Sequence, residues 1–172
     1  MILRVSDISD DGLTIEDVSL FGSPFSDRSW RLDRVHLRAK RDGDDIIVTG
    51  EIDSTVPVTC GRCLDELPAR VRATVDVRFI PRPPTGDRVE LGSDDLDLDF
   101  YQGDEVNLAA LVASETALAL PMKPLCREDC RGLCPVCGGN RNLVACLCPE
   151  RAPDPRLGAL RDLAARLHHD TP

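Results

Sequence analysis

The stretch ARVRATVDVRFI, residues 69–80, alternates apolar and polar side chains over its length. Its apolar face consists of Val71, Ala73, Val75, Val77 and Phe79. Its polar face consists of Arg70, Arg72, Thr74, Asp76 and Arg78. This pattern is typical of a strand in an antiparallel sheet, because strands that are covered on both faces run continuously apolar. The stretch therefore predicts an antiparallel sheet with one buried and one exposed face.

Shorter stretches upstream are also predicted to be strands. Residues 2–5 (ILRV) and 35–39 (VHLRA) show strand-like alternation, and residues 44–53 (DDIIVTGEID) are typical of a strand that follows a turn. Residues 55–60 (TVPVTC) continue the extended character. Because Pro57 has no backbone N–H to donate, it marks an edge or a bulge of the sheet.

Two helices are predicted after the strands. Residues 107–120 (NLAALVASETALAL) form one, with Asn107 as its cap and Pro121 at its end. Its buried stripe would consist of Leu108, Leu111, Val112, Leu118 and Ala119. A final helix would begin near Asp154 and Pro155. Its apolar face would consist of Leu157, Leu160, Leu163, Ala164 and Leu167.

Six of the eight cysteines lie within residues 126–148, CREDCRGLCPVCGGNRNLVACLC, and the other two form CGRC at Cys60 and Cys63. No secretory signal is visible, and no apolar run reaches the ~20 residues that span a bilayer. We therefore expect a cytoplasmic protein that does not enter a membrane, in which thiols hold metal rather than form disulfides. Residues 122–150 have too few large apolar side chains to fold alone. A zinc ion bound by thiolates would order them.

One candidate zinc site lies entirely within the cysteine-rich segment. CPVCG, residues 134–138, has the two-residue spacing of a zinc knuckle, and its glycine lets the backbone curl beneath the metal. Cys146 and Cys148 would complete the site, although the single-residue spacing of CLC is unusual. Cys130 is the alternative ligand.

A second site would join distant parts of the chain. Cys126 and Cys130 would share an ion with Cys60 and Cys63, which precede them by 62 intervening residues. The alternative is a single zinc ion, with the remaining four thiols free or peripheral. The predicted cofactor is thus one or two structural zinc ions. The candidate metal ligands are Cys134, Cys137, Cys146, Cys148, Cys60, Cys63, Cys126 and Cys130.

The sequence shows no strong catalytic pattern. CGRC has an alternative interpretation as a redox pair, but that chemistry favours a helix start after the motif, and only LDELP follows it. His36 lies in a predicted strand, and His168 and His169 are adjacent in sequence, so they do not form a metal-binding pair. Since every candidate zinc ligand is a cysteine, four thiolates would close each site to water. We expect a non-enzymatic protein with no catalytic residues and no small-molecule substrate.

The formal charge of −9 is unevenly distributed. Acidic residues are concentrated in residues 87–105, whereas residues 27–41 (DRSWRLDRVHLRAKR) are rich in arginine. Aromatic residues make up only 3% of the chain, which disfavours base stacking on an aromatic platform. The arginine-rich stretch predicts local contact with phosphate, or else it is simply the charged face of a strand. Its candidate nucleic-acid contacts are Arg28, Arg31, Arg34, Arg38, Lys40 and Arg41.

Several motifs, in this order and spacing, carry a family resemblance. They are VTCGRCL at 58–64, DLDFYQGDEVNLAALV at 97–112, ETALALPMKPLC at 115–126, CRGLCPVCGGNRN at 130–142, CLC at 146–148 and DPRLGALRDL at 154–163. In these the chain resembles the YceD family, proteins linked to accumulation of large-subunit ribosomal RNA and described as metal-binding. The resemblance implies a non-enzymatic role in large-subunit biogenesis.

Together these observations predict an α+β fold: an antiparallel sheet packed with a helix, then a small cysteine-rich zinc module and a C-terminal helix. The predicted boundaries are 1–122 for the sheet domain, 123–150 for the zinc module and 151–172 for the helix. The expected function is support of large-subunit biogenesis and 23S rRNA accumulation, by binding ribosomal RNA or a large-subunit ribosomal protein. The alternatives are a protein-binding zinc module unrelated to ribosomes and a thiol-redox protein that uses CGRC.

Overall fold

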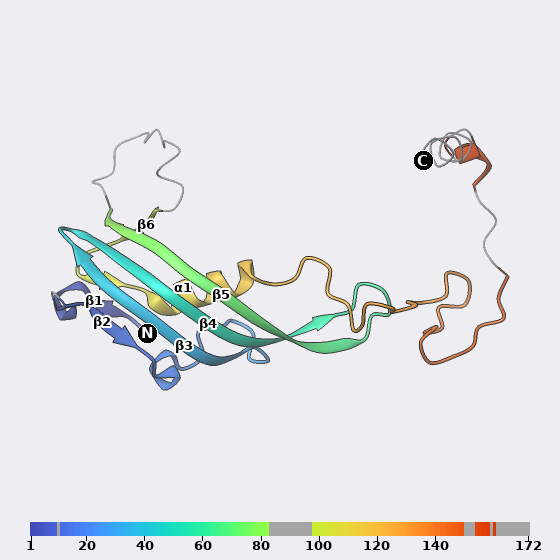
Figure 1. Ribbon diagram of the computed structural model, residues 1–172, viewed down its shortest axis with the longest axis horizontal. Coiled ribbons are helices and arrows are strands. Elements are labelled where there is room, and N and C mark those ends of the chain that lie inside the picture. The colour runs from blue at the N-terminus through green and yellow to red at the C-terminus, as the bar shows by residue number, and fades with distance from the viewer. Residues whose placement is uncertain (10, 83–97, 150–153, 159, 161–172) are drawn as a thin grey trace, which may run out of the picture. The chain divides into compact units, whose positions relative to one another are not determined.

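The computed structural model describes residues 1–9, 11–82, 98–149, 154–158 and 160 (Figure 1). The chain divides into two compact units. The first unit comprises Met1–Cys60 and Glu66–Pro124, and the second comprises Gly61–Asp65 and Leu125–Pro172. The short loop Gly61–Asp65 is thus part of the cysteine-rich unit, although a division at residue 122 places it in the sheet domain.

The first unit is built on a five-stranded sheet with the order β2-β3-β4-β5-β6. The strands are β2 (Leu13–Ile15), β3 (Arg31–Asp42), β4 (Asp45–Thr59), β5 (Glu66–Pro81) and β6 (Leu98–Tyr101). A separate antiparallel pair consists of β1 (Leu3–Arg4) and β7 (Glu105–Val106). Short 3-10 helices follow β1 and β2, namely η1 (Val5–Asp7) and η2 (Val18–Phe21). The strands predicted around residues 2–5, 35–39, 44–60 and 69–80 are therefore confirmed.

Strands β2 to β5 are antiparallel, as the alternation of β5 predicts. Val71, Ala73, Val75 and Phe79 of β5 are buried, and the arginines between them are exposed. The expectation of an antiparallel sheet is wrong only for β6, which runs parallel to β5 with Arg78 opposite Leu98. Two consecutive strands can be parallel when a long connection returns the chain to the same end of the sheet, and the segment between β5 and β6 provides that length.

Pro57 illustrates how the long β4–β5 hairpin extends past its neighbour. Arg31, the first residue of β3, pairs with Thr55 of β4. Beyond this point β4 pairs only with β5, and Pro57 lies directly opposite Pro68. Since a proline cannot donate to a ladder, both are tolerated where β4 has lost its second neighbour. The prediction that Pro57 marks an edge is confirmed.

Helix α1 (Leu108–Leu118) packs on β4 and β5. Asn107 caps it, accepting a hydrogen bond from the Ala110 N–H at 3.0 Å, as predicted. Leu108, Leu111 and Val112 are buried, but the predicted burial of Leu118 and Ala119 is wrong, since Leu118 is 79% exposed. Burial ends instead at Thr116, whose hydroxyl meets that of Ser54 at 3.3 Å. Periodicity predicts the face of a helix but not how far its partner extends along it.

The described part of the chain is therefore α+β, with a mostly antiparallel sheet and one α-helix. Of the predicted C-terminal helix, the structure describes the 3-10 helix η4 (Pro155–Leu157) and two residues after it, and the rest lies outside the described residues. Within the described ranges, no helix is long and apolar enough to cross a bilayer.

Candidate metal centres and an arginine cleft

The eight cysteine sulfurs gather into two groups of four. The first cluster contains Cys60, Cys63, Cys126 and Cys130. The second cluster contains Cys134, Cys137, Cys146 and Cys148. Within each cluster all sulfurs lie within 4.8 Å of one another, and none of the eight forms a disulfide. This is the partition proposed from spacing for two zinc ions, with Cys130 in the first cluster rather than as a substitute in the second.

The distances between sulfurs suit a tetrahedral ion. Zinc–thiolate bonds of about 2.3 Å place neighbouring sulfurs about 3.8 Å apart at the corners of a tetrahedron. The Sγ atoms of Cys63 and Cys126 are 3.6 Å apart, and Cys146 lies 3.6 Å from Cys137 and 3.4 Å from Cys134. Four sulfurs are also the donor set that zinc prefers in closed structural sites. Each cluster could therefore hold a metal ion.

The first cluster is largely buried. Cys60, Cys63 and Cys130 are at most 4% exposed, and Cys126 is exposed. The side-chain amide of Asn142 donates to the Cys130 sulfur at 3.3 Å. Burial acts to raise the pKa of Cys130, but donation from Asn142 and from the Gly132 backbone outweighs it, so the pKa lies below its ordinary value. Amide donors thus favour a thiolate in a site where burial alone would disfavour one.

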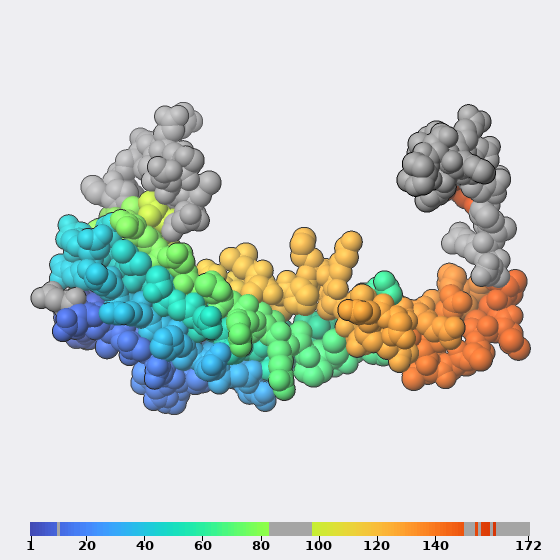
Figure 2. Space-filling model, viewed as in Figure 1, coloured from blue at the N-terminus to red at the C-terminus, as the bar shows by residue number. Residues whose placement is uncertain are grey.

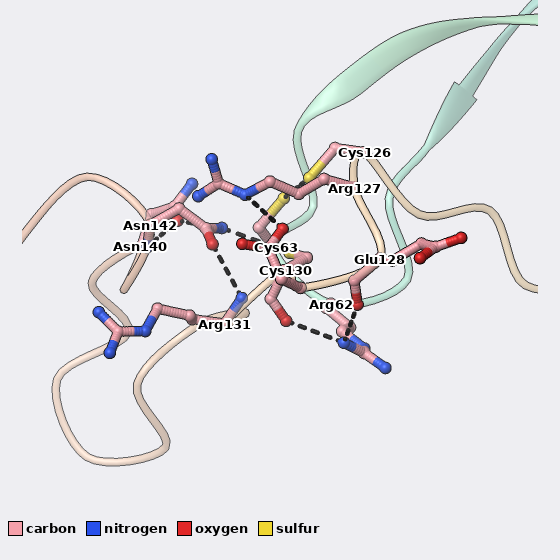
Figure 3. Close-up of polar contacts among 10 residues, drawn as sticks. Arg62, Cys63, Cys126, Arg127, Glu128, Cys130, Arg131, Asn140 and Asn142 are labelled. Atoms are coloured by element: carbon pink, nitrogen blue, oxygen red, sulfur yellow. Dashed lines mark hydrogen bonds and ion pairs between the residues drawn. The ribbon is translucent and has the colours of Figure 1, made fainter.

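Arg62, between the cysteines of CGRC, ties this loop to the cysteine-rich segment (Figure 3). Its guanidinium donates to the backbone oxygens of Glu128 at 3.1 Å and of Cys130 at 3.0 Å. Its own carbonyl accepts from the Leu133 N–H at 3.1 Å. Gly132 has a φ of +68°, and a Cβ there would lie 2.9 Å from the Arg62 oxygen. Only glycine permits both this backbone conformation and this close approach.

Two asparagines that spacing arguments overlooked complete the framework. Asn142 accepts from the Arg131 N–H at 2.8 Å while its amide donates to Cys130 and Asn140. Asn140 in turn donates to the Asp65 carboxylate at 2.9 Å. A metal ligand is commonly held by such outer partners, which fix its orientation. The signal in the sequence was the NRN triplet directly after CPVCGG.

The second cluster is built on a tight turn and is more exposed. The Cys134 N–H donates to the Gly139 oxygen at 2.8 Å, and the Gly138 N–H donates to the Cys134 oxygen at 2.9 Å. The Val136 N–H points at the Cys134 sulfur at 3.4 Å. Cys134 is buried, but Cys137 is exposed and Cys146 and Cys148 are half-buried. The tight turn predicted from CPVCG is therefore present.

Charge is unequally shared in the second cluster. Backbone N–H groups of Cys137 and Val136, with the thiol of Cys146, lower the pKa of Cys134 to about 6. Hydrogen bonds with Cys146 and Cys137 raise the pKa of Cys148 to about 12. The hydrogen bonds of the turn thus favour a thiolate at Cys134 and a protonated thiol at Cys148. Four thiolates can share so small a volume only around a positive ion.

The surroundings of CGRC bear on the redox alternative. The motif forms the turn between the antiparallel strands β4 and β5, and no helix begins within the described residues 60–68. A nucleophilic cysteine of the redox type usually lies at the start of a helix, where the backbone dipoles lower its pKa. The geometry around Cys60 and Cys63 thus favours metal binding over thiol exchange.

The arginine-rich stretch does not form a single patch. Arg31 and Arg34 line a cleft of 440 Å³ together with Arg70 and Arg72 of β5, which sequence analysis did not single out. Arg38 and Arg41 donate instead to the backbone oxygens of Asp11 and Gly43. The cleft does not include Arg28 or Lys40.

The lining of the cleft could have been found from the polar face of residues 69–80 once the register of the β4–β5 hairpin was known. We call Arg31, Asp33, Arg34, Asp53, Arg70 and Arg72 the arginine cleft.

Comparison with known proteins gives relatives without described functions. The chain is 30% identical over 103 residues to uncharacterized proteins of Mycobacterium bovis and Mycobacterium tuberculosis, covering 59% of this chain and 48% of theirs. It is 28% identical over 102 residues to an uncharacterized protein of Mycobacterium leprae, covering 59% of this chain and 46% of that protein. The chain thus spans about half the length of these relatives. No solved structure matches it.

A family model supplies the assignment. It spans residues 48–164, which include both cysteine clusters, β5 and helix α1, and it is described as large ribosomal RNA subunit accumulation protein YceD. On this match over more than half of its length, the chain belongs to the YceD family.

Proposed function

We propose that this protein is a non-enzymatic, zinc-stabilised factor that supports the accumulation of 23S rRNA and the biogenesis of the large ribosomal subunit. It acts by binding ribosomal RNA or a large-subunit ribosomal protein in the cytoplasm. The observation that carries the proposal is the family match over residues 48–164, because the family's name implies a role in accumulation of large-subunit ribosomal RNA. The two cysteine clusters are compatible with the metal-binding part of the proposal.

The chemistry of the clusters supports a structural role for the metal. A catalytic zinc site keeps one position open for water or substrate. Each cluster here offers four sulfurs within 4.8 Å of one another, enough to fill a tetrahedral ion. Zinc in such sites stabilises the fold, and its removal unfolds the segment that it orders. The expected activity is therefore binding.

A cellular experiment tests the function. In cells that lack the protein, we expect mature large-subunit rRNA to fall relative to small-subunit rRNA, measured on total RNA and on ribosome gradients. The full chain should restore the ratio, and a Cys134→Ser, Cys137→Ser chain should not. Normal gradients and a normal ratio in the deletion strain would contradict the proposal.

A second candidate, a zinc module that binds a protein unrelated to ribosomes, is favoured by one observation. Apolar side chains around the second cluster are exposed: Val136 by 56%, Val144 by 61%, Leu143 by 79% and Leu147 by 97%. Exposed apolar residues close together often mark a protein interface. Capture of the tagged full chain, with joint identification of bound RNA and proteins, separates the two candidates. Ribosomal components support the first, and their absence beside one stoichiometric protein supports the second.

A further inference from the structure

We propose that the arginine cleft binds phosphate groups of an RNA backbone. The proposal deepens the function proposed above and rests on it for the identity of that RNA. The cleft lies wholly within the first unit, on strands β3, β4 and β5. Figure 2 looks onto the blue-to-green surface that these strands form.

The strand register arranges the arginines in two rows. In one row, Asp53 of β4 pairs with Arg34 on one side and Arg72 on the other. In the next row, Thr55 of β4 lies between Arg31 and Arg70. Residues directly opposite one another in an antiparallel sheet project from the same face. Four guanidinium groups therefore flank a central column of β4.

An irregularity in β3 shapes this arrangement. The register shifts between Leu32 and Arg34, so that Asp33 is an extra residue in β3. Asp33 and Arg34 are consequently both exposed, although neighbouring residues in a strand normally face opposite sides. Asp33 accepts hydrogen bonds from Arg31 Nε at 2.6 Å and from the Thr55 hydroxyl. Bulges commonly re-aim side chains beside binding sites.

The two carboxylates hold the arginines without neutralising all of them. Asp53 accepts from Arg34 Nε and Arg72 Nε, both at 2.8 Å, one at each of its oxygens. The hydrogen bond from Arg72, with a further one from Arg34, holds the pKa of Asp53 below its ordinary value. Arg70 has no hydrogen-bond partner among the described residues. Four arginines and two aspartates leave two positive charges.

The donors that remain suit phosphate. Arg31 and Arg72 use only Nε in these bonds, and their terminal nitrogens and the whole Arg70 guanidinium stay available. A planar guanidinium matches two phosphate oxygens at once, and carboxylate partners that fix its orientation reduce the entropy lost on binding. On β5, Arg70 and Arg72 are two residues apart, about 7 Å along the strand. That separation is comparable to the one between neighbouring phosphates of a polynucleotide.

The lining also indicates what is recognised. No aromatic side chain is among the residues that line the cleft, so it offers no surface for stacking a base. Recognition through guanidinium groups alone reads the backbone and not the base sequence. The occupant we infer is therefore a run of phosphates in RNA, bound with little sequence preference.

The test compares two variants that remove equal charge from the first unit. Arg31→Gln, Arg70→Gln changes the cleft, whereas Arg4→Gln, Lys123→Gln changes exposed cations outside the cleft. Each full-length protein is titrated against a short duplex RNA of mixed sequence over a range of salt concentrations. We expect the cleft variant to lower the slope of log K against log salt by about two, because each lost phosphate contact removes about one. The control variant should keep the wild-type slope and affinity.

Additional measurements test whether free phosphate competes for the cleft and whether each variant is folded. Competition by a large excess of inorganic pyrophosphate should displace little RNA, since the cleft is matched to a row of phosphates. Metal content and thermal midpoint of each variant report folding, and Arg31→Lys, Arg70→Lys should recover affinity in part by restoring charge. Equal losses in cleft and control variants, or no binding by the wild-type protein, would overturn the proposal. Neither outcome changes the expected rRNA ratio in the deletion strain, so the proposed function is tested independently of the cleft.

Discussion

Each cysteine cluster offers four thiols, but the two clusters draw them from the chain in different ways. The first cluster draws Cys60 and Cys63 from the turn between β4 and β5 and the other two from the cysteine-rich segment, and it is mostly buried. The second takes all four from residues 134–148 and is largely open to solvent. Closing the longer loop through the first cluster removes more chain entropy, by about 1.5 kcal/mol on the logarithmic dependence on loop length. The first cluster thus organises distant chain segments, and the second organises a local turn.

Removal of either pair of ligands should give the largest effect. We expect the purified chain to carry two zinc ions, and Cys60→Ser, Cys63→Ser and Cys134→Ser, Cys137→Ser each to lose one, as measured by elemental analysis. Apparent zinc affinities of structural sites are on the order of 10 kcal/mol, so the affected part should unfold. Amide exchange should distinguish the variants.

In the first variant, the Leu133 amide, which donates to the Arg62 carbonyl, should lose protection. In the second variant, the Gly138 amide, which donates to the Cys134 carbonyl, should lose protection instead. Unchanged zinc content in the Cys60→Ser, Cys63→Ser chain would separate CGRC from the metal and revive its redox interpretation.

Two glycines, one beside each cluster, should give smaller losses of stability when replaced by alanine. Gly132 and Gly138 both have positive φ, but a Cβ at Gly132 would meet the Arg62 oxygen, while nothing lies within 4 Å at Gly138. We expect Gly138→Ala to cost about 1 kcal/mol from backbone strain, and Gly132→Ala about 2–4 kcal/mol because a steric clash is added. Chemical denaturation measures the free energy of unfolding of each variant. The chelator concentration that removes zinc then shows which variant holds its metal less tightly. Equal costs would mean that the loop Gly61–Asp65 does not hold Gly132 tightly.

Asn142 should affect one cluster selectively. Its amide donates to the Cys130 sulfur, so Asn142→Ala should weaken metal binding at the first cluster by about 10–100-fold, the usual effect of losing an outer partner. The second cluster should keep its affinity. Competition with a chromogenic chelator, read as two successive release steps, measures this. Leu143→Ala, at a neighbouring side chain that is 79% exposed, is the matched control and should change neither step.

Local patterns predicted much of the fold. The period-two alternation of residues 69–80 gave β5 and its buried face, and Asn107 marked the start of α1, because both depend on neighbours along the chain. The parallel pairing of β6 could not be predicted, since strand direction depends on the path of a connection. The exposure of Leu118 was also missed, because burial depends on whether a partner reaches the last turn.

For the sites, the sequence by itself determined which atoms are available: eight thiols in pairs whose spacing suits tetrahedral metal sites, and a stretch rich in arginine. Only the tertiary structure decided which of them meet. It brought CGRC to Cys126 and Cys130, because the β4–β5 hairpin ends at that turn and the Arg62 and Asn142 contacts hold the segments together. It also placed Arg70 and Arg72 beside Arg31 and Arg34, because strand register sets which residues lie opposite one another, and composition carries no information about register.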